Sequence, residues 1–105
     1  MQIGSIVTMT AFVEPDKYDN RRKIVRSECV PTTCVYLGKS ILHEGRIVGG
    51  GVEWDTGAYE PRWLSVEKSI TVAVVQPLNE HGRYRLPFRA LPEDVQLHTV
   101  EVMKP

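Results

Sequence analysis

Apolar residues recur at every second position along most of this chain, and this period constrains the fold more than any other feature. Alternation is clearest in SIVTMTAFV (5–13), where Val7, Met9, Ala11 and Val13 share one face of a strand. SITVAVVQ (69–76) is the densest run of β-branched residues. We find no helical pattern of ten residues or more, so the sequence predicts an all-β protein.

Turn-forming residues divide the first half of the chain into strands. The polar segment EPDKYDNRR (14–22) is typical of a loop. KIVRSECV (23–30) predicts a short strand closed by Pro31, whose missing N–H ends a ladder. CVYLG and SILHEGRIV (34–48) follow as β-type segments around a bulge or bend at Gly38 and Lys39, and the three glycines at 49–51 end them.

The second half predicts a central hairpin between SITVAVVQ and RYRLPFR (83–89). Tyr84, Leu86 and Phe88 alternate with arginines and are expected in the core. Pro87 indicates an edge position or a bulge in this strand. LPEDV (91–95) has the pattern of one tight helical turn, and QLHTVEVM (96–103) predicts the last strand.

A chain of 105 residues has the size of one domain, which we place at 1–105. Five or six short antiparallel strands without helices indicate a small barrel or a sandwich, and barrel closure removes sheet edges more economically. The segments YLGKSILHEGRIV, SITVAVVQPL and YRLPFRALPEDVQ resemble SH3-like small β-barrels, including those of uncharacterised bacteriophage and prophage proteins. This resemblance implies a one-turn helix before the last strand, which ALPEDV matches.

Charge and composition narrow the classes of partner. Thirteen acidic and thirteen basic residues cancel, so the general attraction of a basic domain to nucleic acid is absent. No apolar run approaches the roughly 18 residues of a membrane span. The opening residues, MQIGSIVTMTAFVE, lack the basic and long apolar regions of a secretory signal, so we expect a cytoplasmic protein, in the host cytoplasm if phage-encoded.

The segment IVGGGVEWDTGAYEPRW (47–63) is the best candidate for a binding surface. It lacks the lysine and the following helix of a phosphate-binding loop, so the glycines indicate a strand-to-loop junction. Tryptophan and tyrosine dominate interface hot spots, and a polar loop cannot bury all of its aromatic residues. We expect Trp63 to be the most buried aromatic residue and Trp54 the most exposed. The predicted partner-binding residues are Trp54, Tyr59, Glu60, Arg62 and Trp63.

A second candidate surface is basic. Arg83, Arg85 and Arg89 fall on one face of a predicted strand, and basic residues from 21–26 are candidates to join them. Such a face can bind the phosphates of nucleic acid or an acidic protein surface. Arginine is also common on the solvent side of an exposed strand, where it discourages edge pairing.

Metal binding and catalysis find little support in the sequence. Two cysteines and three histidines could supply the ligands of a zinc site, but the histidines are dispersed along the sequence. The simpler interpretation of Cys29 and Cys34 is that they are reduced, buried thiols. No GxSxG or HExxH pattern occurs, and no cofactor is indicated. The sequence therefore predicts a non-enzymatic module that binds a protein partner. The alternatives are a nucleic-acid-binding barrel and a structural virion or assembly component.

Overall fold

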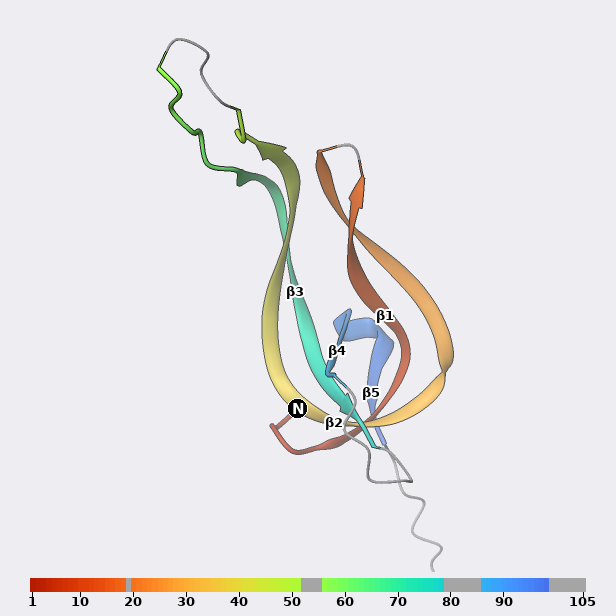
Figure 1. The fold of residues 1–105 in the computed structure, drawn as a ribbon. Helices are drawn as coiled ribbons and strands as arrows, with labels where there is room; N and C mark the ends of the chain where they lie inside the picture. The colour runs from red at the N-terminus through yellow and green to blue at the C-terminus, as the bar shows by residue number, and fades with distance from the viewer. Residues whose placement is uncertain (19, 52–55, 79–85, 99–105) are drawn as a thin grey trace, which may run out of the picture.

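The described residues form a single antiparallel sheet of five strands and one short 3-10 helix (Figure 1). A computed structural model describes residues 1–18, 20–51, 56–78 and 86–98. The all-β prediction is confirmed, although three strands are far longer than expected. The elements are β1 (Ile6–Tyr18), β2 (Arg21–Val48), β3 (Trp63–Pro77), β4 (Phe88–Ala90), η1 (Pro92–Asp94) and β5 (Val95–Leu97).

The first hairpin joins β1 to β2 and replaces the loop expected at 14–22. Pairing continues to the end of both strands, where Tyr18 lies opposite Arg21. Asn20 has a φ of 61° in the turn, a conformation that asparagine tolerates better than most residues. The side chains at 14–16 are exposed to solvent, which accounts for the polar composition of this segment. A polar composition therefore did not indicate a loop here.

β2 is one continuous strand that pairs with β1 over its first half and with β3 over its second. The expected end at Pro31 is wrong. The β1–β2 register shifts between Met9 and Ala11, and the proline lies in the unmatched stretch, where its missing N–H breaks no ladder bond. The bulge expected near Gly38 is confirmed by a register shift between Tyr36 and Gly38, and β2 ends at Val48, directly before the glycines.

The C-terminal elements connect β3 back to β1. β4 pairs with β3 through Val75 and Phe88 and with β1 through Val13 and Arg89, so successive pairings run from β1 through β2, β3 and β4 to β1 again. η1 confirms the one-turn helix, with proline at its start and acids in its first turn. β5 then pairs with β1, shorter than the predicted strand at 96–103, of which residues from 99 on lie outside the described ranges.

The core consists of two neighbouring clusters of buried side chains. Phe88 packs against the first and lies 5.1 Å from Phe12 between ring centroids, as its predicted core position requires. Leu86 contradicts the same prediction, because it precedes β4 and is 86% exposed, and Tyr84 lies outside the described residues. The first cluster holds Val7, Met9, Cys34, Tyr36, Ala73, Val75, Ala90 and Val95; the second holds Val13, Leu42 and Val72.

We expect Leu42→Ala to lower the free energy of unfolding by about 2 to 4 kcal/mol, because it leaves a cavity in the second cluster. The adjacent Ile41 is 57% exposed, so Ile41→Ala is the matched control and should cost well under half as much. Urea denaturation followed by circular dichroism measures both. Equal effects of the two variants would show that Leu42 is not in a packed core.

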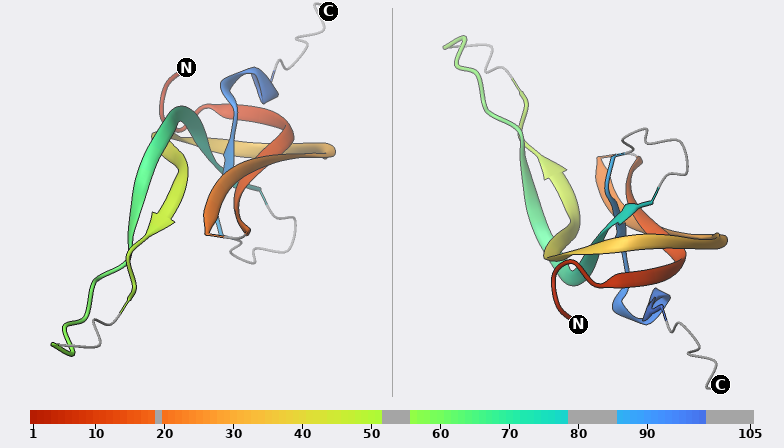
Figure 2. Two further views of the ribbon diagram at one scale, coloured as in Figure 1. Left: turned by 90° about the horizontal axis from the view of Figure 1, so that it is seen from above. Right: turned by 90° about the horizontal axis from the view of Figure 1, so that it is seen from below.

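The outer part of the β2–β3 hairpin extends away from the core, as both views in Figure 2 show. We call residues 43–51 and 56–69 the arm. The radius of gyration is 19.1 Å, whereas a compact chain of this length has about 13 Å. No strand other than β2 pairs with β3 between Trp63 and Val72, so the described arm is a two-stranded ribbon. Most of its described side chains are exposed and therefore accessible to a partner.

Candidate functional site

The glycines at the end of β2 allow two strands of the arm to approach closely. Gly49 and Gly50 have φ values of 82° and 86°, a region that favours glycine. A Cβ atom on Gly49 would lie 2.2 Å from the carbonyl oxygen of Pro61, and one on Gly50 would lie 2.6 Å from Cγ of Arg62. The Gly50 N–H donates to the carbonyl oxygen of Glu60 at 2.9 Å. These glycines thus allow the backbone of residues 60–62, which include two of the predicted binding residues, to pack directly against the chain that follows β2.

The predicted binding residues of the arm are exposed wherever the structure describes them. Tyr59 is 69% exposed and Trp63 is 51% exposed, and Glu60 and Arg62 are also exposed. Trp63 is more buried than Tyr59, in the expected order, but it lies on the arm and belongs to neither core cluster. Trp54 lies outside the described residues.

A pocket of about 310 Å³ brings part of this segment together with the first hairpin. Trp63 and Leu64 begin β3, Ile47 lies opposite Leu64 in β2, and Arg62 precedes the strand. The unexpected member is Arg22, which is about 40 positions away in sequence. The pocket is lined by Arg22, Ile47, Arg62, Trp63 and Leu64.

Two hydrogen bonds hold the first hairpin beside the arm and so position Arg22. The Ile47 N–H donates to the carbonyl oxygen of Asn20 at 2.6 Å. The Ile24 N–H donates to the Glu44 carboxylate at 2.9 Å. Sequence reasoning grouped Arg22 with its basic neighbours, whereas alternation along a strand separates it from them: Arg22 is half-buried, and the residues on either side are exposed.

The pocket has the chemistry of a site for an anionic group. The Nε atom of Arg22 is buried and has no hydrogen-bond partner in the described part of the chain. Among the residues that the structure describes, neither Arg22 nor Arg62 forms an ion pair. Guanidinium groups bind carboxylates and phosphates through paired N–H donors, and the indole of Trp63 adds a large apolar wall with a polar tip. The pocket therefore combines positive charge with apolar surface.

The other basic residues do not gather into one described face. Arg89 is exposed on β4, while Arg83 and Arg85 lie outside the described ranges. Arg89 lines a groove of about 500 Å³ in which it is accompanied by an acid and by several apolar residues. The groove is formed by Val13, Glu14, Pro15, Leu86, Pro87, Phe88 and Arg89.

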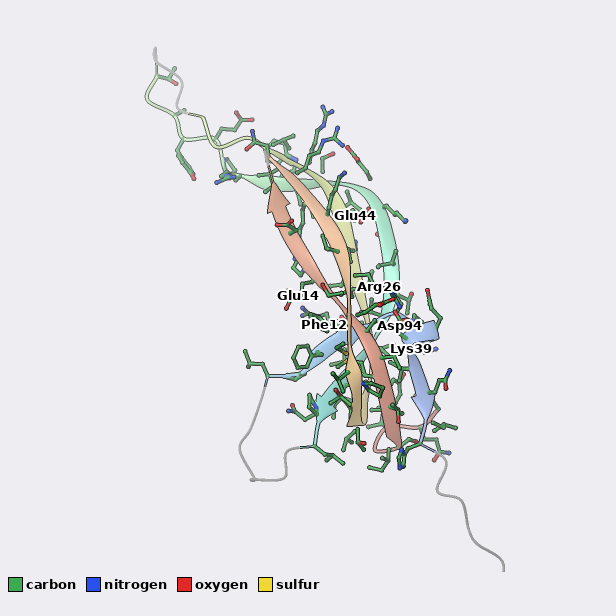
Figure 3. All side chains as sticks on the ribbon, turned by 90° about the vertical axis from the view of Figure 1, so that its right-hand side faces the viewer. Phe12, Glu14, Arg26, Lys39, Glu44 and Asp94 are labelled. Carbon is green, nitrogen blue, oxygen red and sulfur yellow. The ribbon has the colours of Figure 1, made fainter. Side chains whose placement is uncertain are left out.

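Arg26 is committed to a buried acid and not to a binding face. Its Nε and a terminal nitrogen donate to the two oxygens of Asp94 at 2.9 and 2.7 Å (Figure 3). The Asp94 side chain is only 7% exposed. Its hydrogen bonds to Arg26 hold the pKa of Asp94 below the ordinary value, against the opposing effect of burial. This pair ties β2 to η1.

The cysteines and histidines serve local contacts in the structure. Cys29 and Cys34 are free thiols, and burial, followed by the neighbouring Cys29, raises the pKa of Cys34 to about 11. His43 hydrogen-bonds a serine hydroxyl at 2.7 Å, His98 contacts a threonine hydroxyl at 3.3 Å, and His81 lies outside the described residues. Within the described ranges, no three His, Cys, Asp or Glu side chains are grouped to hold a metal ion.

The described part of the chain contains no helix of the length and apolar character needed to cross a membrane. Comparisons with family models, with curated proteins and with solved structures find no match to this chain.

Proposed function

We propose that this protein is a non-enzymatic protein-interaction module whose partner binds the arm. The observation that carries the proposal is a two-stranded ribbon that extends from the core and presents large apolar side chains to solvent. Those side chains belong to Ile41 at the base of the arm and to Tyr59, Trp63 and Val66 on it.

The physical properties of such a ribbon support an interaction role. A two-stranded hairpin is only marginally stable in water without a further strand or a packing surface. Exposed aromatic residues provide large contact area at a low cost in conformational entropy, and they are common hot spots of interfaces. A partner that covers Tyr59 and Trp63 would stabilise the arm and gain most of its affinity from these two residues.

The proposal takes the rest of the fold as a small SH3-like β-barrel that acts as the base of the arm. Two features support this: the strand pairings return to β1, and a one-turn helix precedes the last strand. The resemblance to phage and prophage proteins suggests a host protein or a virion protein as the partner. An assembly component that acts as an oligomer would use the same arm against its own copies.

We expect Trp63→Ala to abolish capture of the partner from a lysate of the natural host. Val30 is 81% exposed on β2 and belongs to neither the arm nor the pocket, so Val30→Ala is the control and should capture as the natural sequence does. The lysate is tested with and without nuclease, and captured proteins are identified by mass spectrometry.

A protein retained after nuclease treatment and lost in Trp63→Ala supports the proposal. Capture that Trp63→Ala and Tyr59→Ala leave intact would contradict it. Recovery of only nuclease-sensitive material would favour the nucleic-acid alternative.

A further inference from the structure

We propose that the pocket between the two hairpins receives a carboxylate of the partner, carried on an acidic segment with apolar neighbours. The inference rests on the proposed function and specifies the chemistry of the partner. It depends on the juxtaposition of Arg22 from the first hairpin with Arg62, Trp63 and two aliphatic residues of the arm.

The unused hydrogen-bonding capacity of the pocket points to an anion. Arg22 carries a guanidinium group, and its Nε lies buried with no acceptor among the residues that the structure describes. Leaving a donor of a charged group unpaired in a buried position is costly, and native structures seldom do so without a reason. The described residues of the lining include two guanidinium groups and no acid. A bound carboxylate would pair with the two guanidinium groups of the lining and balance their charge.

The walls of the pocket favour an acid that has apolar neighbours. Ile47, Trp63 and Leu64 supply the apolar part of the lining. The volume of about 310 Å³ is at the lower end of the range for ligand sites, enough for a side chain or two but not for a large cofactor. An acidic side chain flanked by a leucine or an aromatic residue would satisfy the arginines and cover Trp63 together.

The arrangement of the other charges disfavours an extended polyanion. Nucleic acid is bound through a track of several basic residues that follows its backbone. Arg21 and Lys23 flank Arg22 in a strand, so they point to the opposite side. Arg26 and Arg46 are each paired with an acid of this chain. Within the described residues, the pocket thus offers two arginines without an acidic partner at one place and not a track.

The test is a selection of short random peptides on the immobilised full chain, followed by measurement of the best binder. We expect enriched peptides to place Asp or Glu beside a leucine or an aromatic residue. The best peptide is synthesised with capped ends, and its Kd is measured by fluorescence anisotropy. Arg22→Gln and Arg62→Gln should each weaken binding by about tenfold or more, because each removes a charge-assisted hydrogen bond.

Arg21→Gln is the matched control, since Arg21 is exposed and outside the pocket, and it should leave the Kd unchanged. Arg62 is exposed, so its variant informs the test even if Arg22→Gln unfolds the chain, which circular dichroism would reveal. Replacing the acids of the peptide by their amides should weaken binding as much as either arginine variant does.

The outcomes separate this inference from the proposed function. Peptides that need Trp63 but neither arginine would overturn the carboxylate site and leave the interaction module standing. A selection that yields no arginine-dependent binder would also overturn the inference. Displacement of the peptide by an oligothymidylate, with loss of oligonucleotide binding in both arginine variants, would reassign the pocket to phosphate. The capture experiment with Trp63→Ala tests independently whether the protein is an interaction module.

Discussion

Arg26→Met is expected to lower the melting temperature by at least about 5 °C, because it leaves the carboxylate of Asp94 buried without its partner. Both oxygens of Asp94 accept from Arg26, at 2.9 and 2.7 Å. Arg46→Met is the control: Arg46 contacts Glu67 at 3.9 Å between two largely exposed side chains, and such pairs contribute little. Thermal denaturation followed by circular dichroism measures both variants.

The effect of Arg26→Met should also depend on pH. Hydrogen bonds from Arg26 lower the pKa of Asp94 in the folded state, while the unfolded value is about 3.9. The pair therefore contributes fully above that unfolded value, and its contribution is lost as the pH falls through the lower folded value. The difference in melting temperature between the natural sequence and Arg26→Met should be constant near neutral pH and shrink below about pH 4.

A second substitution distinguishes two explanations for the effect of Arg26→Met: an unpaired buried charge and a simple loss of packing. Adding Asp94→Asn to Arg26→Met removes the uncompensated carboxylate, so the double variant should melt at a higher temperature than Arg26→Met alone. A double variant that melts lower, or a difference that persists unchanged at acidic pH, would contradict the assigned role of this pair.

Gly45→Val is expected to open the arm, with a loss of about 2 kcal/mol or more in the stability of the β2–β3 pairing. A Cβ atom on Gly45 would lie 1.9 Å from the carbonyl oxygen of Ser65 and 3.1 Å from Cα of Val66. Both are backbone atoms of the facing strand, at the register shift beside Glu44, so no side-chain movement relieves the clash. Amide hydrogen exchange measures the effect, and the N–H groups of the arm should lose protection.

Gly51→Ala is the control for this variant. Among the described residues, its Cβ would meet only a flexible carboxylate oxygen of Glu60 at 4.0 Å, and Gly51 has no positive φ. We expect its exchange pattern to match that of the natural sequence. Retention of full protection in the arm of Gly45→Val would show that the two strands are not packed as closely as the structure has them.

Sequence patterns correctly predicted the features of the fold that depend on a few neighbouring residues. The strand from residue 5, the bulge at Gly38, the end of β2 before the glycines and the turn at Pro92 each follow from alternation or from the backbone limits of glycine and proline. Alternation, however, reports which face of a strand is buried. Residues 14–16 of β1 are polar and exposed, so the apolar alternation that marks a strand is absent there.

The candidate site was predicted only in part, because sequence patterns report local features and the pocket is formed by residues far apart in the sequence. The sequence identified a glycine-rich segment with aromatic residues as the binding surface, and Tyr59 is exposed there; Trp63, expected to be the most buried of them, is also 51% exposed. The pocket itself depends on a contact between Asn20 and Ile47 that no local pattern encodes. Arg22 joins the site only because the first hairpin reaches the arm, so its role became visible only in three dimensions.

The most direct test of the central claim is amide hydrogen exchange on the purified complex with the captured partner, compared with the free protein. A partner that binds the arm should slow exchange at residues 43–51 and 56–69 and leave β4 and β5 unchanged. Protection confined to β4, β5 or the groove beside Arg89, with an unchanged arm, would contradict the proposed function.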